Sequence, residues 1–502
     1  MQLTPSFVAL AAASAAVAAN ASPVSQLHKR AGAPFTFDGR TFQDKGLVGF
    51  ARIPTDALDS FGETIGGVGS AIALEYFRPS ATGGTFSILL QPDRGHNSGG
   101  AETSDYRARN HRYLGTLSAQ NGTNENISLR YVNSQLYRAG PDYALNFTTG
   151  LDPNGTRQSN PRAPNLPIAL PNNHISFDTE GLAISSNGLQ LFVSDEYQPG
   201  IYIIDRTTGV LLNTIVPPPA ILPYDATGKL NFTSLSNPTT GRAPNQGFEG
   251  LTLDRNTNTL WALLQSATIQ DSNKGSKSTN RYTRLLGYDV SNIFNARLIK
   301  EHVVPLPQSK SGNTRASSEV HIVDDTTFLV LARDGNGFGN EDAGVSYKHA
   351  DLISTKNATN IANTPFDQVN LPVSPAGRIN NTIVPATYQS FIDLASSAEL
   401  AKFGLNNGAS GVFDRNLLSG KLESLAIASA GDEQNKDDVY LFVVSDNDFI
   451  TLNGKQAAQD STGKYVVGSY NDTYALQKGS QDTQFFIYRA TIPGYSQAGS
   501  AN

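Results

Sequence analysis

The chain has 502 residues, 39% of them hydrophobic, and a formal net charge of -6 at pH 7. It contains no cysteine, which excludes disulfides, thiol catalysis and thiolate metal sites. Because it also lacks a dense run of lysine or arginine, neither nucleic acid nor an anionic membrane surface is the expected partner, and small molecules or cations fit better. This length allows up to three domains of about 150 residues, or one large domain built from repeats.

The first residues are typical of a secretory signal. Residues 1–21 form an Ala-rich apolar run that ends in small residues, as signal peptidase prefers, and the run is too short to cross a bilayer of about 30 Å. Residues 22–30 end in Lys29 and Arg30, which resembles a dibasic pro-segment cleavage site, although an ordinary charged linker fits nearly as well. We therefore expect a single mature domain over residues 31–502.

Acceptor sequences for N-glycosylation support export. Each consists of an asparagine followed by a non-proline residue and then by Ser or Thr. We therefore expect a secreted, extracellular glycoprotein. The asparagines are Asn121, Asn126, Asn146, Asn154, Asn231, Asn357, Asn380 and Asn471.

Stretches that share one plan recur along the chain, which is the pattern of a repeat fold. Each contains two short apolar strands across a polar turn, and a leading Glu and a trailing polar cluster frame most copies. In the first copy, Gly or Ser replaces the leading Glu. In chain order the copies cover residues 66–95, 178–196, 247–267, 317–335 and 421–448.

The spacing of the copies leaves room for four strands per repeat. The leading glutamates are 69, 70 and 104 residues apart, and further strand-like runs lie between the copies at residues 200–216 and 284–291. Four strands per unit is the blade of a β-propeller. We therefore predict an all-β fold, a β-propeller of six blades within a range of five to seven.

Other segments complete the expected ring. Residues 150–173 and 217–245 are rich in Pro and Asn and predict long surface loops. Residues 387–405 place apolar side chains on one helical face, which predicts a short helical insertion in the longest interval. The run at residues 483–492 is expected to pair with residues 42–53, which would close the ring and hide its edge strands.

Several short motifs resemble one known family. The motifs are TEGLA, GFEGL, LVLARDG, LESLAI and VVSDNDF, and together they resemble the phytase-like family, also called esterase-like activity of phytase. This resemblance covers about residues 42–492 and implies a secreted or periplasmic β-propeller that hydrolyses esters or phosphoesters. The Asp-Ala-x-Asp-Asp-Pro-Ala stretch of true β-propeller phytases is absent, which argues against phytate hydrolysis.

Carboxylates are expected to gather at one mouth of the central channel. In a blade, the start of the first strand and the end of the antiparallel second strand lie on the same face. Like charges collected there raise one another's pKa or require a cation, and oxygen ligands favour Ca²⁺, which takes about 6 to 8 of them, over zinc. The expected calcium ligands are Glu180, Asp195, Glu249, Glu319, Asp334, Glu423 and Asp446.

Two alternatives to these ligands stay open. The repeated glutamates would also suit hydrogen bonds between neighbouring blades, with arginines as ion-pair partners, and repetition at every blade favours that interpretation for most of them. The Gly-rich loop at residues 333–344 is a second calcium candidate, with oxygen ligands at Asp334, Asn336, Asn340 and Asp342. A polar turn driven by glycine fits that loop at least as well.

The catalytic candidates are Asp93, Arg94, His96 and Arg333. Both arginines follow second strands, where a guanidinium group can bind a phosphate or carboxylate oxyanion at two points. Asp93 or His96 would transfer a proton, while a bound cation polarises the ester and lowers the pKa of an attacking water. The sequence therefore predicts a calcium-dependent hydrolase of small phosphoesters or carboxylic esters, with its oligomeric state open. The alternative is a non-catalytic extracellular propeller that binds a ligand, glycan or protein at this face.

Overall fold

The computed structural model describes residues 32–97, 103–140, 147–157, 165–170, 173–340 and 343–495. The expected signal peptide and pro-segment, Asn146 and Asp342 lie outside the described residues. Among the helices in those ranges, none is long and apolar enough to cross a membrane.

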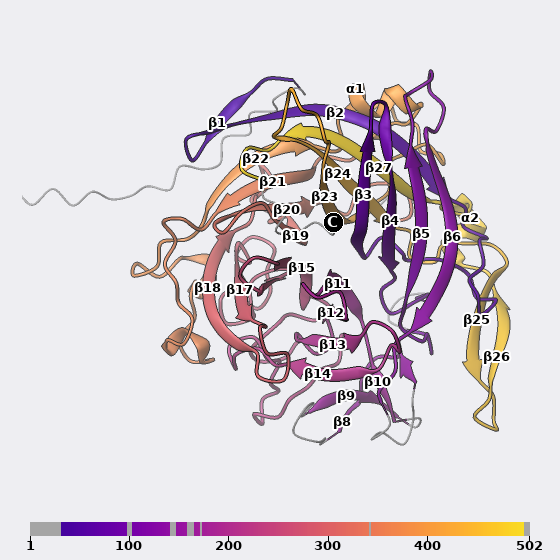
Figure 1. The fold of residues 1–502 in the computed structure, drawn as a ribbon. Coiled ribbons are helices and arrows are strands. Elements are labelled where there is room, and N and C mark those ends of the chain that lie inside the picture. Colours follow the sequence, from indigo (N-terminus) through magenta and orange to yellow (C-terminus); the bar gives the residue numbers. More distant parts are fainter. Residues whose placement is uncertain are drawn as a thin grey trace, which may run out of the picture.

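A ring of antiparallel sheets surrounds one axis (Figure 1). Within the described ranges five sheets take part, and the innermost strand of each contacts the innermost strand of the next until the fifth contacts the first. This confirms the predicted propeller. These innermost strands are β3 (Ala71–Ser80), β11 (Thr179–Ile184), β15 (Phe248–Asp254), β19 (Ala316–Ile322) and β23 (Lys421–Ser429).

Each of the first four blades adds its outer strands in chain order. These are β4 (Gly83–Gln91), β5 (Arg109–Leu117) and β6 (Ile127–Leu136), then β12 (Gln190–Asp195), β13 (Ile201–Asp205) and β14 (Leu211–Ile215), then β16 (Thr259–Leu264), β17 (Tyr282–Asp289) and β18 (Arg297–Pro305), and finally β20 (Thr327–Arg333), β21 (Lys348–Ser354) and β22 (Thr387–Asp393).

The described ring has five blades, the lower end of the expected range and one fewer than the predicted six. The difference lies in the 104-residue interval between Glu319 and Glu423. That interval holds the outer strands of the fourth blade and a long connection at residues 355–386, which carries the short 3-10 turns η1 (Pro365–Asp367) and η2 (Pro375–Gly377) instead of a further blade.

The fifth blade joins the two ends of the described chain. Its order is β23, β24 (Asp438–Asp446), β27 (Thr483–Thr491), β2 (Arg40–Ile53) and β1 (Phe35–Phe37). Strands β2 and β27 are antiparallel, with Gln43 opposite Thr491 and Ile53 opposite Thr483, as predicted. The closure removes two unpaired sheet edges. Aromatic side chains from three strands, Phe86, Phe442 and Phe485, pack where this blade meets the first.

Two local predictions were wrong in part. Residues 387–393, predicted as helix, form β22, and only α1 (Ser397–Leu400) and the 3-10 turn η3 (Ala401–Phe403) are helical. The open edge of β21 offers backbone partners to a Thr-, Tyr- and Phe-containing segment, which suits a strand better than its helical periodicity. Residues 150–173, predicted as loop, contribute to a small sheet outside the ring. Its strands are β7 (Thr148–Thr149), β8 (Gly155–Arg157), β9 (Leu166–Ala169) and β10 (His174–Ser176).

A hairpin projects from the fifth blade. It consists of β25 (Gly454–Gln459) and β26 (Tyr465–Tyr470) and is followed by the helix α2 (Thr473–Lys478). Figure 1 shows this hairpin beside the first blade, on the outer side of the ring.

Candidate functional site

A β-bulge marks the start of several innermost strands. The register shifts after Thr179 in β11, at Glu249 in β15 and at Glu423 in β23. A bulge re-aims the side chain of the extra residue and often lies beside a functional site. Because Thr179 pairs with Asp195 and Lys421 with Asp446, the starts of first strands and the ends of second strands do share one face, as predicted.

We call the group of interacting carboxylates at this face the acidic mouth. All but one of its members are buried, and Asp448 is half-buried. The arginine and lysine side chains that interact with them, Arg94, Arg242, Arg333, Lys348 and Lys421, are fewer than the carboxylates. The members of the acidic mouth are Asp93, Asp178, Glu180, Glu196, Glu249, Glu423, Asp446 and Asp448.

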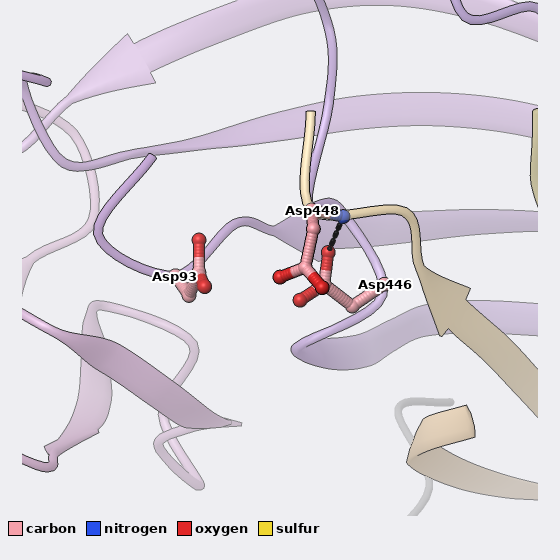
Figure 2. A group of neighbouring side chains, drawn as sticks. All are labelled: Asp93, Asp446 and Asp448. Atoms are coloured by element: carbon pink, nitrogen blue, oxygen red, sulfur yellow. Dashed lines mark hydrogen bonds between the residues drawn. The ribbon is translucent and has the colours of Figure 1, made fainter. Parts of the chain in front are cut away.

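In one part of the acidic mouth, a lysine side chain of the protein already pairs with the carboxylates. Oxygen atoms of Asp93, Asp446 and Asp448 all lie within 4.8 Å of one another. Figure 2 shows Asp446 and Asp448 side by side, with Asp93 opposite them and the backbone N–H of Asp448 donating to Asp446 Oδ1 at 2.6 Å. Lys421 Nζ donates to Asp446 at 2.5 Å and to Asp448 at 2.8 Å. This lysine therefore supplies much of the positive charge that these carboxylates require.

The backbone after β24 is strained where it presents these groups. Asp448 and Phe449 both have a positive φ, 50° and 54°, which costs free energy for residues other than glycine. The side chain of Asn447 holds the turn, because its Oδ1 accepts from the N–H of Gly67 at 2.8 Å and its Nδ2 donates to the carbonyl of Gln481 at 2.8 Å. The strained turn aims Asp448 back at Lys421.

The other part of the acidic mouth has unused oxygen atoms. Oxygen atoms of Asp178, Glu180 and Glu196 lie within 4.8 Å of one another. Arg94 Nη1 lies 3.2 Å from Asp178 Oδ2. Glu196 Oε1 and Glu249 Oε2 are buried and have no hydrogen-bond partner in the described part of the chain. A buried, unpartnered carboxylate oxygen is costly, so these atoms fit a bound cation.

Burial and crowding raise the pKa of these acids. Burial is the largest cause and raises the pKa of Glu196 to about 8, with the Asp178 carboxylate adding to the effect. Burial, followed by neighbouring carboxylates, raises the pKa of Glu180 and Glu249 well above the ordinary value. Without a cation, such a cluster holds protons near neutral pH. Oxygen ligands of this kind suit a hard divalent cation such as Ca²⁺.

Glu319 is a correction to the predicted ligand set. In β19 the bulge falls at Ser318, so Glu319 lies one residue beyond the position that Glu249 and Glu423 occupy. Its Oε1 accepts from the N–H of Leu251 at 2.9 Å and from its own strand at Val320. Glu319 therefore fastens the third blade to the fourth, in agreement with the alternative interpretation, and does not join the acidic mouth.

Asp195 and Asp334 also accept hydrogen bonds from backbone N–H groups. The oxygens of Asp195 accept from the N–H groups of Asp178 at 2.9 Å and Gln198 at 2.7 Å. Asp334 Oδ2 accepts from the N–H of Tyr347 at 2.9 Å, and Lys348 Nζ lies 3.5 Å from its Oδ1. Both carboxylates hold turns at the ends of strands, so the structure does not support either as a metal ligand.

Three of the predicted catalytic residues belong to the acidic mouth or pair with it. Asp93 is a member, and Arg94 forms an ion pair with the member Asp178. His96 Nε2 instead lies 3.0 Å from Asp472 Oδ2, and its ring stacks on Tyr470 at 4.2 Å between ring centres. Arg333 forms an ion pair with Glu423 and donates from Nε to Ser318 Oγ at 3.0 Å. The ion-pair interpretation of Arg333 is therefore the one that the contacts support.

Sequence reasoning missed Asp178 and Lys421. Both stand two residues before a leading glutamate, Glu180 and Glu423 respectively, so they occupy the same position in two repeats. Both lie where a first strand begins, next to the end of the second strand, since the N–H of Asp178 donates to Asp195 and Lys421 pairs with Asp446. A charge at this repeat position was therefore the signal that pointed to the acidic mouth.

The glycosylation sequons differ in exposure. Asn121, Asn154, Asn357 and Asn471 are exposed, whereas Asn231 and Asn380 are half-buried. Asn126 is buried, and its side-chain amide donates to the carbonyls of Val48 and Ser118 at 2.9 Å each. A glycan on this nitrogen conflicts with these hydrogen bonds, so the structure does not support Asn126 as an acceptor.

The ring and its acidic axial face define the class of this protein, a five-bladed β-propeller within the described residues. The profile of the phytase-like family, described as esterase-like activity of phytase, matches residues 109–449. The chain is also 33% identical over 467 residues to a protein of Arthroderma benhamiae described as an uncharacterized secreted protein, and this match covers 83% of the chain and 89% of that protein. The chain belongs to the phytase-like family.

Similar solved structures include a gluconolactonase and a propeller. The periplasmic gluconolactonase of Pseudomonas aeruginosa is 11% identical, with a TM-score of 0.28 and coverage of 88% of this chain and 99% of that one. The Dos1 propeller is 9% identical, with a TM-score of 0.25 and coverage of 76% of this chain and 64% of that one.

Proposed function

We propose that this protein is a secreted, calcium-dependent hydrolase of phosphoesters or carboxylic esters, with its active site at the acidic mouth. The observation that carries the proposal is the pair of buried, unpartnered oxygens Glu196 Oε1 and Glu249 Oε2, in a cluster where Glu196 interacts with Arg94. Family membership supports the reaction class, and the relative described as secreted supports an extracellular location.

Asp178, Glu180 and Glu196, whose oxygens lie within 4.8 Å of one another, are the residues that would hold the cation, with Glu249 interacting with Glu196. Their free oxygen atoms suit Ca²⁺, which takes about 6 to 8 oxygen ligands. A bound divalent cation polarises an ester or phosphoester oxygen and lowers the pKa of an attacking water. The carboxylates also repel a substrate anion, so an arginine must accompany them.

Arg94 and Asp93 have the properties that substrate binding and proton transfer require. The Arg94 side chain is 15% exposed and is oriented by Asp178 and by Asn245 Oδ1 at 2.5 Å, so its guanidinium group can bind a phosphate or carboxylate oxygen in a fixed direction. Burial and the neighbouring Asp446 raise the pKa of Asp93 well above its ordinary value. A carboxyl group with a raised pKa holds its proton more readily and can donate it to a leaving group.

The test is hydrolysis of nitrophenyl phosphate and nitrophenyl acetate in calcium and in EDTA. We expect turnover of at least one substrate in calcium, its loss in EDTA, and at least a hundredfold lower kcat for D93N, since general acid catalysis contributes about a hundredfold or more. E319Q is the matched control, because Glu319 is a buried glutamate of the same repeats outside the acidic mouth. Turnover that survives both EDTA and E196Q would overturn the proposal.

A non-catalytic propeller is the second candidate. It is favoured by the ion pairs of Lys421 with Asp446 and of Arg333 with Glu423, which already use part of the acidic mouth. In that case calcium should raise the thermal unfolding temperature of the wild type and leave that of E196Q unchanged, with no hydrolysis of either nitrophenyl substrate.

A further inference from the structure

A polar pocket lies between the first and second blades, among residues outside the acidic mouth. Its volume is about 390 Å³. The residues that line it come from β5, β6 and the turns of the second blade, and none of them is an acid. They are Asn110, Arg112, Asn133, Gln135, Arg206 and Thr207, together with Gly188.

A β-bulge in β3 organises the two arginines. The register shifts between Leu74 and Tyr76, so Glu75 is the extra residue. Glu75 Oε1 accepts from Arg112 Nη2 at 2.7 Å and also from Arg206 Nη2. Its Oε2 accepts from Ser87 Oγ at 2.5 Å. One carboxylate thus holds two guanidinium groups from neighbouring blades side by side, and both of its oxygens are used.

The groups left over in the pocket are mainly hydrogen-bond donors. Arg112 Nε is buried and has no partner in the described part of the chain. Arg112 Nη1 and the exposed side-chain amide of Asn133 also make no hydrogen bond within the described residues. The positive charge is in excess, because two arginines share one carboxylate and Arg206 also interacts with Arg255, whose pKa is lowered by burial and by this repulsion.

An ion pair buried within one blade looks different in this protein. Arg284 joins Asp271 and Glu301 in the interior, with its side chain 1% exposed. Its Nε, Nη1 and Nη2 all have partners there, and Nη1 also donates to the carbonyl of Phe366. The pair at Glu75 instead opens onto a cavity with donors unused.

From this contrast we infer that the pocket between the first and second blades binds the phosphate or sulfate group of a small ligand. Arg112, Arg206 and Asn133 supply the donors, and Glu75 holds the two guanidinium groups in place. Guanidinium groups suit this task because their planar donors match tetrahedral oxyanions at two points. The site is independent of the proposed hydrolase, since it contains none of the residues of the acidic mouth.

The test is isothermal titration of the full chain in EDTA, so that no metal occupies the acidic mouth, with inorganic phosphate, sulfate, glucose 6-phosphate and glucose. We expect one binding site for the anions and none for glucose. R112Q should weaken binding about tenfold or more, because a charge-assisted hydrogen bond is lost. R130Q, a change at an exposed arginine of β6 outside the pocket, should bind like the wild type.

A second variant protects the test against misfolding. N133L fills the pocket from an exposed position and leaves the Glu75 pairs intact, so it should fold normally and lose anion binding. Tighter binding of glucose 6-phosphate than of inorganic phosphate would indicate a sugar-borne anion, and equal binding a free one. Absence of anion binding to the wild type at millimolar concentration, or binding unchanged in both R112Q and N133L, would overturn the inference.

Discussion

Replacing Glu196 by glutamine should make the stability of the metal-free protein depend less on pH. Glu196 is 2% exposed, and burial followed by the Asp178 carboxylate raises its pKa from 4.5 to about 8. In the unfolded chain the group ionises near its ordinary value, so raising the pH stabilises the unfolded state first. Glutamine matches the shape of the protonated side chain and cannot ionise.

The magnitude follows from the two pKa values. Relative to the fully protonated protein, ionisation of this group in the unfolded state costs about 1 kcal/mol of folding stability at about pH 5 and about 4 kcal/mol at about pH 8. The effect begins near the ordinary pKa of 4.5 and levels off above the folded pKa of about 8. These figures are upper limits, since neighbouring acids adjust when one charge is removed. The free energy of unfolding of E196Q should therefore increase relative to that of the wild type as the pH rises.

The assay is urea unfolding in EDTA at intervals between about pH 5 and about pH 9, with E319Q as the control. Calcium titrations of the wild type and E196Q complete the experiment. Because the cation must displace the proton on Glu196, calcium binding to the wild type should strengthen about tenfold per pH unit up to the pKa of about 8. E196Q should bind calcium more weakly and without that proton release. Parallel stability profiles for wild type and E196Q, with equal calcium affinities, would refute the reasoning.

Three further changes test separate parts of the structure. K421M leaves Asp446 and Asp448 without their shared cation, so urea unfolding should show a loss of about 3 kcal/mol that calcium partly restores; an unchanged midpoint would contradict this role. E249Q should weaken calcium binding while E319Q leaves it unaltered, as measured by titration, and equal losses would place Glu319 in the acidic mouth after all. N126A removes an acceptor for the Phe50 N–H and two donors, so its free energy of unfolding should fall by about 3 kcal/mol. Glycopeptide mapping of the secreted wild-type protein should find glycan at Asn121 and none at Asn126.

The architecture was predictable because it repeats. Alternating apolar residues and recurrent Glu-led copies indicated sheets of four strands, and the pairing of residues 42–53 with residues 483–492 followed from the need to hide sheet edges. The strand β22 was missed because local periodicity suggested a helix, whereas the unpaired edge of β21 decided the outcome. That edge belongs to tertiary structure and leaves no mark on residues 387–393 themselves.

The face that carries the site was also evident from the chain alone, but its membership was not. Antiparallel pairing places every strand start beside a strand end, so acids at those positions had to meet. Whether a given acid points to the axis depends on where the bulge falls, and a shift of one residue sends Glu319 between blades while Glu249 faces the channel. Side chains alternate with a period of two along a strand, so only the register of the folded sheet could separate these two glutamates.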